Sequence, residues 1–362
     1  MENPIPSYLR FTPGKALPHW YRFIARALTG FYYSSIGLVD ERGQRVCAPD
    51  DGIPTLFLTS HRNGATDGWM FSRVSPRAQF LAAVQLLRSR FLRLLFTGIP
   101  VVRDKDRQRY GFSRAQTGNP ALHGIAHLKQ GGDLIIFPEG TSEWGPAPQP
   151  YQPGAVKIIR RLLQEGYALR VIPVGSFYQA PDVFGSRVEL MIGAPLALPD
   201  RAEKTQDAWE AEITECVREA LDRVSVNCAD EETLANVQRY ARQCRRRGES
   251  YAAAFKRVER CAVPVTDVPE TMGTIKKAWA WAWQLPFVST LFPVLLCAWL
   301  AGRRADGRNT VTFFRLAGGF AAAMLWQPCL AVAGVIYPWL WLWYCAAYLG
   351  WRQRAVWGEG GV

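Results

Sequence analysis

The stretch TLFLTSHRNGATD, residues 55–67, joins a short apolar run to a polar turn that contains a histidine. The run has the length and composition of a buried strand, and five similar runs follow it along the chain. Helical stretches separate them, and strands that alternate with helices indicate an α/β domain whose mixed sheet, at least partly parallel, is flanked by helices. The predicted strands are 55–58, 78–83, 99–102, 134–137, 170–174 and 188–192, and the predicted helices are 69–74, 89–97, 119–130, 154–164 and 201–226.

The last quarter of the chain differs in kind from the α/β part. Residues 276–362 hold ten of the 14 tryptophans and half of the net charge of +12, and 279–301 and 316–350 contain no charged residue. Uninterrupted apolar runs of about 18 or more residues can cross a bilayer. We therefore expect an N-terminal interfacial helix region over 1–45, the α/β domain over 46–226, a helical linker over 227–275 and a membrane-embedded helical region over 276–362. The alternative for the last region is a set of buried helices in a large soluble domain.

Basic residues flank both apolar runs. Because positively charged loops stay on the cytoplasmic side of a membrane, these clusters predict that each run enters and returns on that side, with the α/β domain in the cytoplasm. Pro286 and Pro293 would break the first hairpin, and Gln327-Pro328 would mark the turn of the second. An odd number of full spans is the alternative. The basic clusters are Lys276 and Lys277, then Arg303, Arg304 and Arg308, then Arg352 and Arg354.

The N-terminal segment 19–38 interleaves Arg22 and Arg26 with large apolar side chains. This pattern predicts either an interfacial helix or an amphipathic helix packed on the core. No apolar run precedes a small-residue cleavage site near Met1, so we expect no secretory signal. The eight cysteines include no Cys-x-x-Cys pair and no zinc-site spacing, so we expect reduced thiols and no metal site.

His61 is the candidate general base. It follows a predicted strand, and Asp67 lies one helical turn further on. An imidazole oriented by a carboxylate can accept a proton near neutral pH. His127 and Asp133 share the same spacing, but His127 lies within a helical pattern and Asp133 follows a Gly-Gly turn, so we interpret that pair as structural.

Three further blocks give His61 its significance. GIPVVR (98–103) is a turn and strand that end in Arg103, IIFPEGT (135–141) runs from a strand into a turn with a carboxylate, and VIPVG (171–175) is another strand. In this order the four blocks resemble the phospholipid/glycerol acyltransferase (PlsC-like) family over about residues 50 to 200. The most specific part is the sequence FPEGT at 137–141. The resemblance implies that residues 46–226 form an acyltransferase domain.

The resemblance implies roles for the residues of these blocks. His61 would take the proton from an acceptor hydroxyl that attacks an acyl thioester directly, and Asp67 would hold the His61 tautomer. Arg103 would face the phosphate of the acceptor; its alternative role is a surface ion pair with Asp104 or Asp106. Glu139, Gly140 and Thr141 would shape the acceptor site, Lys157 and Arg62 would add positive charge, and Pro173 would form a wall.

The implied function is membrane-associated acyl transfer in phospholipid biosynthesis. The donor would be acyl-CoA or acyl carrier protein as a co-substrate, with no cofactor, and the acceptor a lysophospholipid such as lysophosphatidate. Glycerol 3-phosphate and dihydroxyacetone phosphate are alternative acceptors, and a non-catalytic lipid-binding scaffold is an alternative of another class. The +12 charge lacks an aromatic-basic recognition motif, so we expect no nucleic-acid partner.

Two departures from the family pattern leave details open. The family's first block is His-x4-Asp, whereas here five residues intervene and Thr66 occupies the expected position of the aspartate. We expect Asp67 to orient His61, because a neutral hydroxyl stabilises an imidazolium less well. The third block commonly continues with arginine, but here Ser142 follows Thr141. The identity of the acceptor therefore stays open.

Overall fold

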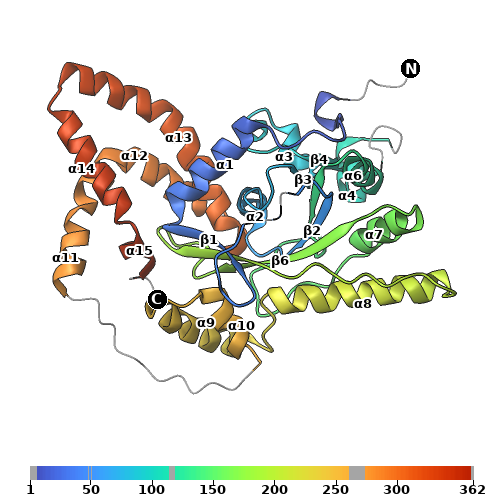
Figure 1. The fold of residues 1–362 in the computed structure, drawn as a ribbon. Coiled ribbons are helices and arrows are strands. Elements are labelled where there is room, and N and C mark those ends of the chain that lie inside the picture. Colours follow the sequence, from blue (N-terminus) through green and yellow to red (C-terminus); the bar gives the residue numbers. More distant parts are fainter. Residues whose placement is uncertain (1–5, 48, 50, 114–118, 261–273, 360–362) are drawn as a thin grey trace.

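The computed structural model describes residues 6–47, 49, 51–113, 119–260 and 274–359. An α/β domain carries a set of C-terminal helices on one flank (Figure 1). Its seven described strands form one mixed sheet in the order β1-β7-β6-β2-β5-β3-β4. The strands β6, β2, β5, β3 and β4 are parallel to one another, while β7 is antiparallel to β6 and parallel to β1. The mixed sheet flanked by helices confirms the predicted fold class.

The six predicted strands are present within a few residues of their predicted limits. Their apolar runs are buried because helices cover both faces of the sheet. They are β2 (Thr55–Thr59), β3 (Ala78–Ala83), β4 (Ile99–Val101), β5 (Asp133–Ile136), β6 (Arg170–Tyr178) and β7 (Arg187–Ile192). A seventh strand, β1 (Ser35–Asp40), lies inside the segment that we expected to be interfacial. It pairs in parallel with β7, a partner about 150 residues away that its local sequence does not reveal.

The strands divide their side chains between two helical layers. On β2, Phe57 faces the layer of α1 (His19–Tyr32) and α2 (Gly64–Phe71). Leu56 and Leu58 face the layer of α6 (Pro120–Lys129), α7 (Gly154–Gln164) and α8 (Gln206–Val224). This alternation is the two-residue period of a strand that is buried on both faces. On α1, the buried face includes Tyr21 and Tyr32, while Trp20 and Phe23 remain exposed.

Short helical elements precede and follow β4 along the chain. The predicted helix 89–97 is wrong in its limits. The chain instead forms α3 (Val84–Arg88) and a 3₁₀ turn, η2 (Leu92–Leu94), because the backbone is extended at Ser89. The helix α4 (Asp104–Tyr110) follows β4, and a second 3₁₀ turn, η1 (Ser7–Leu9), lies near the N-terminus.

The segment that we expected to be a helical linker is helical where it is described, but its helices pack on the sheet. The helix α9 is Glu231–Arg246 and α10 is Tyr251–Val258. Tyr251 and Phe255 lie in one apolar cluster with Phe177 of β6 and Met191 of β7. Most residues of α9 are polar or charged, so its few buried apolar residues did not stand out in the sequence. Residues 261–273 of the expected linker lie outside the described residues.

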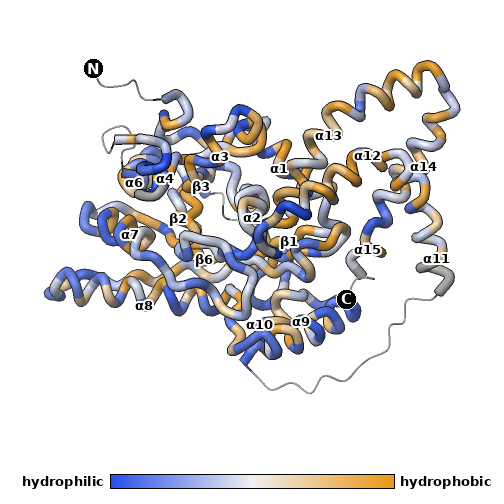
Figure 2. Tube along the Cα trace, turned by 180° about the vertical axis from the view of Figure 1, so that it is seen from behind, coloured by the Kyte–Doolittle hydropathy of each residue, from blue (hydrophilic) through white to orange (hydrophobic). Residues whose placement is uncertain are grey.

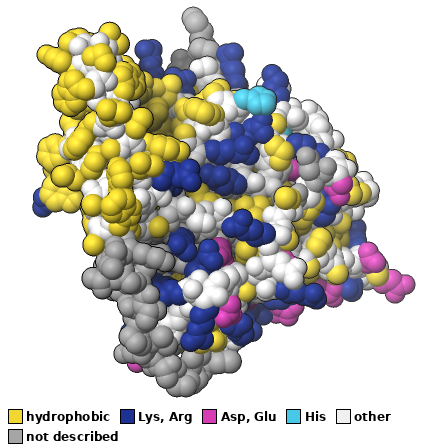
Figure 3. Space-filling view, turned by 60° about the vertical axis from the view of Figure 1, so that its left-hand side comes forward, with side chains coloured by type: hydrophobic (Ala, Val, Ile, Leu, Met, Phe, Trp, Pro, Cys, Tyr) yellow, Lys and Arg dark blue, Asp and Glu magenta, His cyan; other side chains and the backbone are white. Residues whose placement is uncertain are grey.

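The C-terminal region is helical and apolar, with its apolar residues concentrated in α12 to α14 (Figure 2). Two stretches, Ala278–Gly302 and Arg308–Ile336, are long and apolar enough to cross a membrane. The exposed apolar side chains of these helices form one continuous face (Figure 3). The helices are α11 (Thr274–Ala282), α12 (Gln284–Gly302), α13 (Arg308–Ile336), α14 (Leu340–Arg352) and α15 (Ala355–Glu359).

The predicted helix breaks in this region are wrong. The helix α12 runs through Pro286 and Pro293, and α13 runs through Pro328 to Ile336. Proline is tolerated in the first turn of a helix, where Pro286 lies, and in apolar helices whose neighbours compensate for the lost hydrogen bond. The two helices are also joined directly, because Trp326 Nε1 of α13 donates to the Thr290 carbonyl of α12, at 2.8 Å. The turn before α14 instead lies at residues 337–339.

Polar contacts at two points fasten the C-terminal helices to the α/β domain. At the start of α13, Arg308 forms an ion pair with Asp182, at 2.8 Å, and the Thr312 hydroxyl donates to the Pro181 carbonyl. After α14, Arg354 donates to the carbonyls of Gly30 and Tyr33 at 2.6 and 2.7 Å. Two of the three basic clusters therefore adjoin the α/β domain. The side chains of Lys276 and Lys277 lie outside the described residues.

Candidate active site

The predicted site residues gather at one edge of the sheet because they follow parallel strands. His61 follows β2, the FPEGT block follows β5, and Arg103 follows β4. The carboxyl ends of parallel strands lie along the same edge, which is where sites form in such sheets. β2 and β5 are neighbours, with Leu58 paired to Ile136. This pairing brings the first and third blocks together.

His61 and Asp67 form a hydrogen-bonded pair, with Nδ1 of the imidazole 3.0 Å from Oδ2 of the carboxylate. The same carboxylate oxygen accepts the backbone N–H groups of Arg62 and Asn63, both at 2.8 Å. Its other oxygen accepts the Tyr178 hydroxyl at 2.6 Å. Four donors therefore hold this fully buried carboxylate in a fixed position beside the imidazole.

The longer His-x5-Asp spacing is accommodated at Gly64. This residue begins α2 with a φ of +51°, in the left-handed region that glycine adopts without strain. The next turn of the helix then points Asp67 back to the loop at 61–63. Thr66 is buried, and its hydroxyl has no hydrogen-bond partner among the described residues. Within the described part of the chain, Asp67 and not Thr66 orients the imidazole.

Tyr178 lies at the end of β6 and was not singled out in the sequence. Burial raises the pKa of its phenol well above the usual value, and the neighbouring charge of Asp67 raises this pKa further. The hydroxyl therefore stays protonated and donates a hydrogen bond to the carboxylate. Its position at the end of the VIPVG strand was the only available signal, and nothing local links it to Asp67, 111 residues away.

The ring of His61 is fixed in orientation and partly open to solvent. It stacks on Phe137 of the FPEGT block, with 4.2 Å between ring centroids and 26° between planes. Its side chain is 18% exposed, and Nε2 makes no hydrogen bond with any residue in the described ranges. When Nδ1–H donates to Asp67, the lone pair of Nε2 faces outward, as a general base requires.

Glu139 is turned inward rather than toward an open site. Its two carboxylate oxygens accept the backbone N–H groups of His61, at 2.7 Å, and Gln149, at 3.0 Å. Burial raises the pKa of this carboxyl, although both backbone hydrogen bonds oppose the rise. Glu139 therefore positions the backbone of His61 and the following loop, and it shapes the site only indirectly.

Arg103 contacts the third block, a contact that was not predicted from the sequence. Its guanidinium donates to the Gly140 carbonyl at 2.9 Å and is otherwise exposed at the edge of the site. Gly140 makes a tight turn with a φ of +68°, and Thr141 is exposed beside it. The alternative partner Asp106 accepts instead from Gln85, at 2.7 Å. The side chain of Asp104 lies outside the described residues.

The other predicted cations differ in placement. Lys157 lies exposed on α7, and within the described part of the chain no hydrogen bond or ion pair joins its side chain to His61 or Arg103. Arg62 is buried: it donates to the Gly145 carbonyl at 2.8 Å and lies over the Trp144 ring. Burial lowers the pKa of its guanidinium. The expectation that Arg62 adds charge for a phosphate is wrong, because its guanidinium points into the protein.

The start of α13 completes the rim of the site, which sequence reasoning missed entirely. Asn309 donates through Nδ2 to the Ser142 carbonyl, at 2.8 Å, and to the Ser142 hydroxyl, at 3.0 Å. The backbone carbonyl oxygen of Asn309 lies close to Gly64: a Cβ atom added to Gly64 would be only 2.8 Å from this oxygen. The C-terminal region therefore contacts the loop of the first block and the residue that follows the third. No local pattern distinguishes Asn309 in the sequence.

Replacing Asn309 with alanine tests this contact. We expect the loss of both hydrogen bonds to destabilise the protein by about 1 kcal/mol each, and kcat/KM for acyl transfer to fall about threefold to tenfold as the loop shifts. Thermal unfolding and steady-state assays measure the two effects. Asn236→Ala on α9 is the matched control. Unchanged activity in Asn309→Ala would show that the contact does not position the site.

Within the described ranges, no three His, Cys, Asp or Glu side chains gather in a way that could hold a metal ion. Seven cysteines are described, and all are free. Cys261 lies outside the described residues. The His61 ring itself contacts the Asp67 carboxylate and the Phe137 ring.

The chain is similar in sequence to a curated protein and in structure to a solved one. No family model matches the chain. A segment of 127 residues, 33% of this chain, is 32% identical to an uncharacterized acyltransferase of Schizosaccharomyces pombe; the match spans 18% of that relative's length. The crystal structure of the 1-acyl-sn-glycerophosphate (LPA) acyltransferase PlsC from Thermotoga maritima aligns with 56% of this chain and 77% of its own, at 17% identity and a TM-score of 0.37. Over about a third of its length, the chain is therefore similar in sequence to a curated acyltransferase.

Proposed function

We propose that the protein is a membrane-associated O-acyltransferase that acylates the hydroxyl of a glycerophosphate or lysophospholipid. The observation that carries this proposal is the His61–Asp67 pair at the edge of the sheet, with Nε2 facing outward. A buried carboxylate that fixes the tautomer of an imidazole is the arrangement by which a hydroxyl is activated for acyl transfer.

The proposed reaction needs only this pair and two substrates. Nε2 of His61 takes the proton as the acceptor oxygen attacks the carbonyl of an acyl thioester, and Asp67 stabilises the resulting imidazolium. The tetrahedral intermediate then collapses: the C–S bond breaks, and the thiolate takes the proton back from His61. An ester and a free thiol are formed, and the enzyme returns to its starting state. The donor would be acyl-CoA or acyl carrier protein, which supply the thioester.

Charge at the rim supports a phosphorylated acceptor. Arg103 is exposed next to the FPEGT turn, and its link to the Gly140 carbonyl leaves further N–H groups for a phosphate. The carboxylate oxygens of Glu139 and Asp67 accept hydrogen bonds from donors of the protein itself, whereas the Arg103 guanidinium is exposed. Lys157 is exposed on α7, and the proposed phosphate site rests on Arg103 alone.

The exposed apolar face of the C-terminal helices supports membrane association. Large side chains such as Trp279, Leu325 and Val335 are mostly exposed there, and Lys and Arg side chains lie beside the apolar surface (Figure 3). An apolar surface this continuous is typical of a membrane interaction site. Trp20 and Phe23 of α1 extend the apolar exposure on the α/β domain. We propose that this face lies in the cytoplasmic leaflet.

A panel of acceptors tests the proposal. Purified full-length protein with labelled acyl-CoA or acyl carrier protein is expected to convert lysophosphatidate to phosphatidate, with thin-layer analysis of the products. Conversion of glycerol 3-phosphate or dihydroxyacetone phosphate in its place would assign the first acylation step. Lipid binding without any acylated product from either donor would contradict the enzyme proposal and favour a scaffold.

A further inference from the structure

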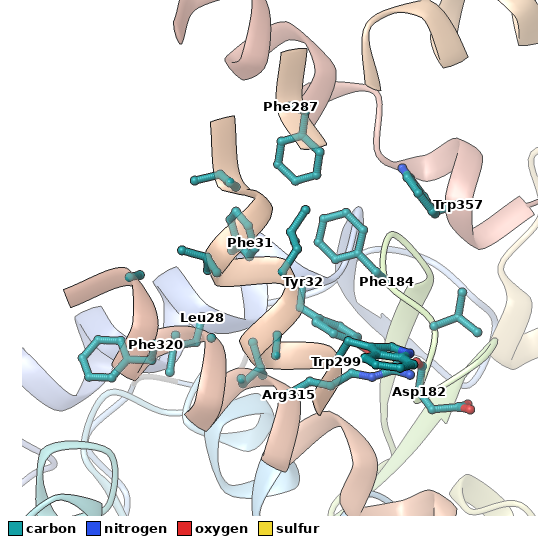
Figure 4. A pocket seen from close by; sticks show the side chains of 18 of the residues that line it. Leu28, Phe31, Tyr32, Asp182, Phe184, Phe287, Trp299, Arg315, Phe320 and Trp357 are labelled. Atoms are coloured by element: carbon teal, nitrogen blue, oxygen red, sulfur yellow. The ribbon is translucent and has the colours of Figure 1, made fainter. Parts of the chain in front are cut away.

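A largely apolar cavity of about 580 Å³ lies between the α/β domain and the C-terminal helices. Its walls come from α1, the loop after β6, α12 and α13, with Trp357 of α15 at one side (Figure 4). Aromatic and aliphatic side chains such as Phe31, Phe184, Leu295 and Phe320 line it. This volume is within the range of cavities that hold a single organic ligand.

One end of the cavity is polar. Arg315, Asp182 and Tyr32 lie together there, with the Arg315 guanidinium donating to the Asp182 carbonyl and the Tyr32 hydroxyl (Figure 4). Nε of Arg315 is buried and has no partner among the described residues. On the outer side, Arg308 forms its ion pair with the same Asp182. The cavity thus has an apolar body with cations at one end, which is the chemistry of a lipid site and not of a water-soluble metabolite.

The polar end lies next to the candidate active site. Asn309, in the first turn of α13, contacts Gly64 and Ser142 at the rim of the site. Leu316, seven residues further along the same helix, lines the cavity. A rise of about 1.5 Å per residue places these two positions about 10 Å apart along the helix. One element therefore leads from the rim near His61 into the cavity.

The cavity can also be reached from the apolar outer face. Trp299 lines it and is 48% exposed, and the next residue, Leu300, is 49% exposed. A lipid that already resides in a bilayer could enter between these helices without exposing its chain to water. A thioester donor, in contrast, arrives from the aqueous side attached to a large polar carrier.

We propose that this cavity holds the acyl chain of a lysophospholipid acceptor. The glycerol hydroxyl of that lipid then lies at His61, and its phosphate lies at Arg103 on the rim of the active site. The inference rests on the proposed function and narrows its acceptor to a lipid rather than soluble glycerol 3-phosphate. The C-terminal helices then form part of the substrate site as well as the membrane attachment.

Two neighbouring leucines of α12 provide a matched test. Leu295 lines the cavity, while Leu296 does not line it and is 40% exposed. Leu295→Trp fills part of the cavity, so we expect KM for oleoyl lysophosphatidate to rise about fivefold to twentyfold. We expect little change in KM for octanoyl lysophosphatidate, whose acyl chain is shorter. Leu296→Trp is expected to behave as wild type with both. If the two variants give the same dependence on acceptor chain length, or if the change follows the donor chain instead, the assignment is overturned.

A second measurement does not depend on turnover. A lysophosphatidate with a photoreactive group on its acyl chain, bound to the His61→Ala protein in phosphatidylcholine vesicles, is expected to label α12 and α13 at cavity residues. Excess unlabelled lysophosphatidate should remove this labelling, and excess phosphatidylcholine should not. Equal competition by phosphatidylcholine would make the occupant a bilayer lipid and overturn the assignment. If the cavity is labelled as expected but the wild-type protein transfers no acyl group, the enzyme proposal is overturned. The lysophospholipid site is then still supported.

Discussion

Replacing His61 with alanine is expected to lower kcat for acyl transfer by about 10²- to 10⁴-fold, the contribution of a positioned general base. The imidazole is the only group at the described site that combines a free lone pair with a fixed orientation. Asp67 holds one side of the ring, Phe137 covers its face, and Nε2 faces the opening. Without the ring, the acceptor hydroxyl must lose its proton to water.

The fold should survive this change. The His61 side chain is partly exposed, and its backbone N–H still donates to Glu139 in the variant. We therefore expect an unchanged apparent unfolding temperature and an unchanged KM, so that the loss appears in kcat. His19→Ala, an exposed histidine at the start of α1, is the matched control and should retain full activity. Acyl transfer by His61→Ala at the wild-type rate would refute the mechanism.

Asp67→Asn should be nearly as damaging to activity, on the order of 10³- to 10⁴-fold in kcat, while leaving the fold intact. The amide oxygen can accept the backbone N–H groups of Arg62 and Asn63, and the amide nitrogen can donate to the Tyr178 hydroxyl. The hydrogen-bond network thus has partners in the variant, but the negative charge that stabilises the imidazolium is absent. Steady-state kinetics and thermal unfolding separate the two consequences.

Thr66→Val is the matched control for Asp67. The Thr66 hydroxyl is buried without a described partner, so a valine of the same shape should leave activity unchanged and cost little stability. A large loss of activity in Thr66→Val together with an active Asp67→Asn would reverse the assignment of the orienting residue. Tyr178→Phe removes one of four donors to Asp67 and should have an intermediate effect on kcat.

The strands of the sheet were largely predictable because their signal is local. Residues 55–58, 78–83 and 170–174 are short apolar runs bounded by turns, and a buried strand needs little else. β1 was not predictable in the same way. Its residues 35–40 include a glycine and are only half buried, and they become a strand through pairing with residues 187–192.

The helices α9 and α10 were not recognised as part of the core because their sequence is highly charged. Residues 229–258 are rich in charge, and this charge favoured an interpretation as a linker. The apolar residues that matter there, Leu234, Val237 and Ala241, recur at helical spacing but are a minority of α9. Their burial depends on a sheet surface formed by distant strands, and composition carries no information about that surface.

The contact between His61 and Asp67 was predictable from sequence, but its surroundings were not. His61 and Asp67 lie within one local turn, so their spacing alone indicated the contact. Tyr178 and Asn309 reach the site from 111 residues beyond Asp67 and from another helical region, respectively. Only the parallel arrangement of β2 and β6, and the packing of α13 on α2, bring them there.

The continuity of α13 has a mechanical consequence. The helix is 29 residues long, about 44 Å at the usual rise, and its first turns are bonded to the loops around His61. In the proposed membrane-bound state, such a rod sets the height of the catalytic pocket above the lipid headgroups. A change in the depth to which the rod enters the cytoplasmic leaflet would be transmitted to the pocket through Asn309 and Arg308. The turnover of the protein would then report the lipid packing of the leaflet that holds it.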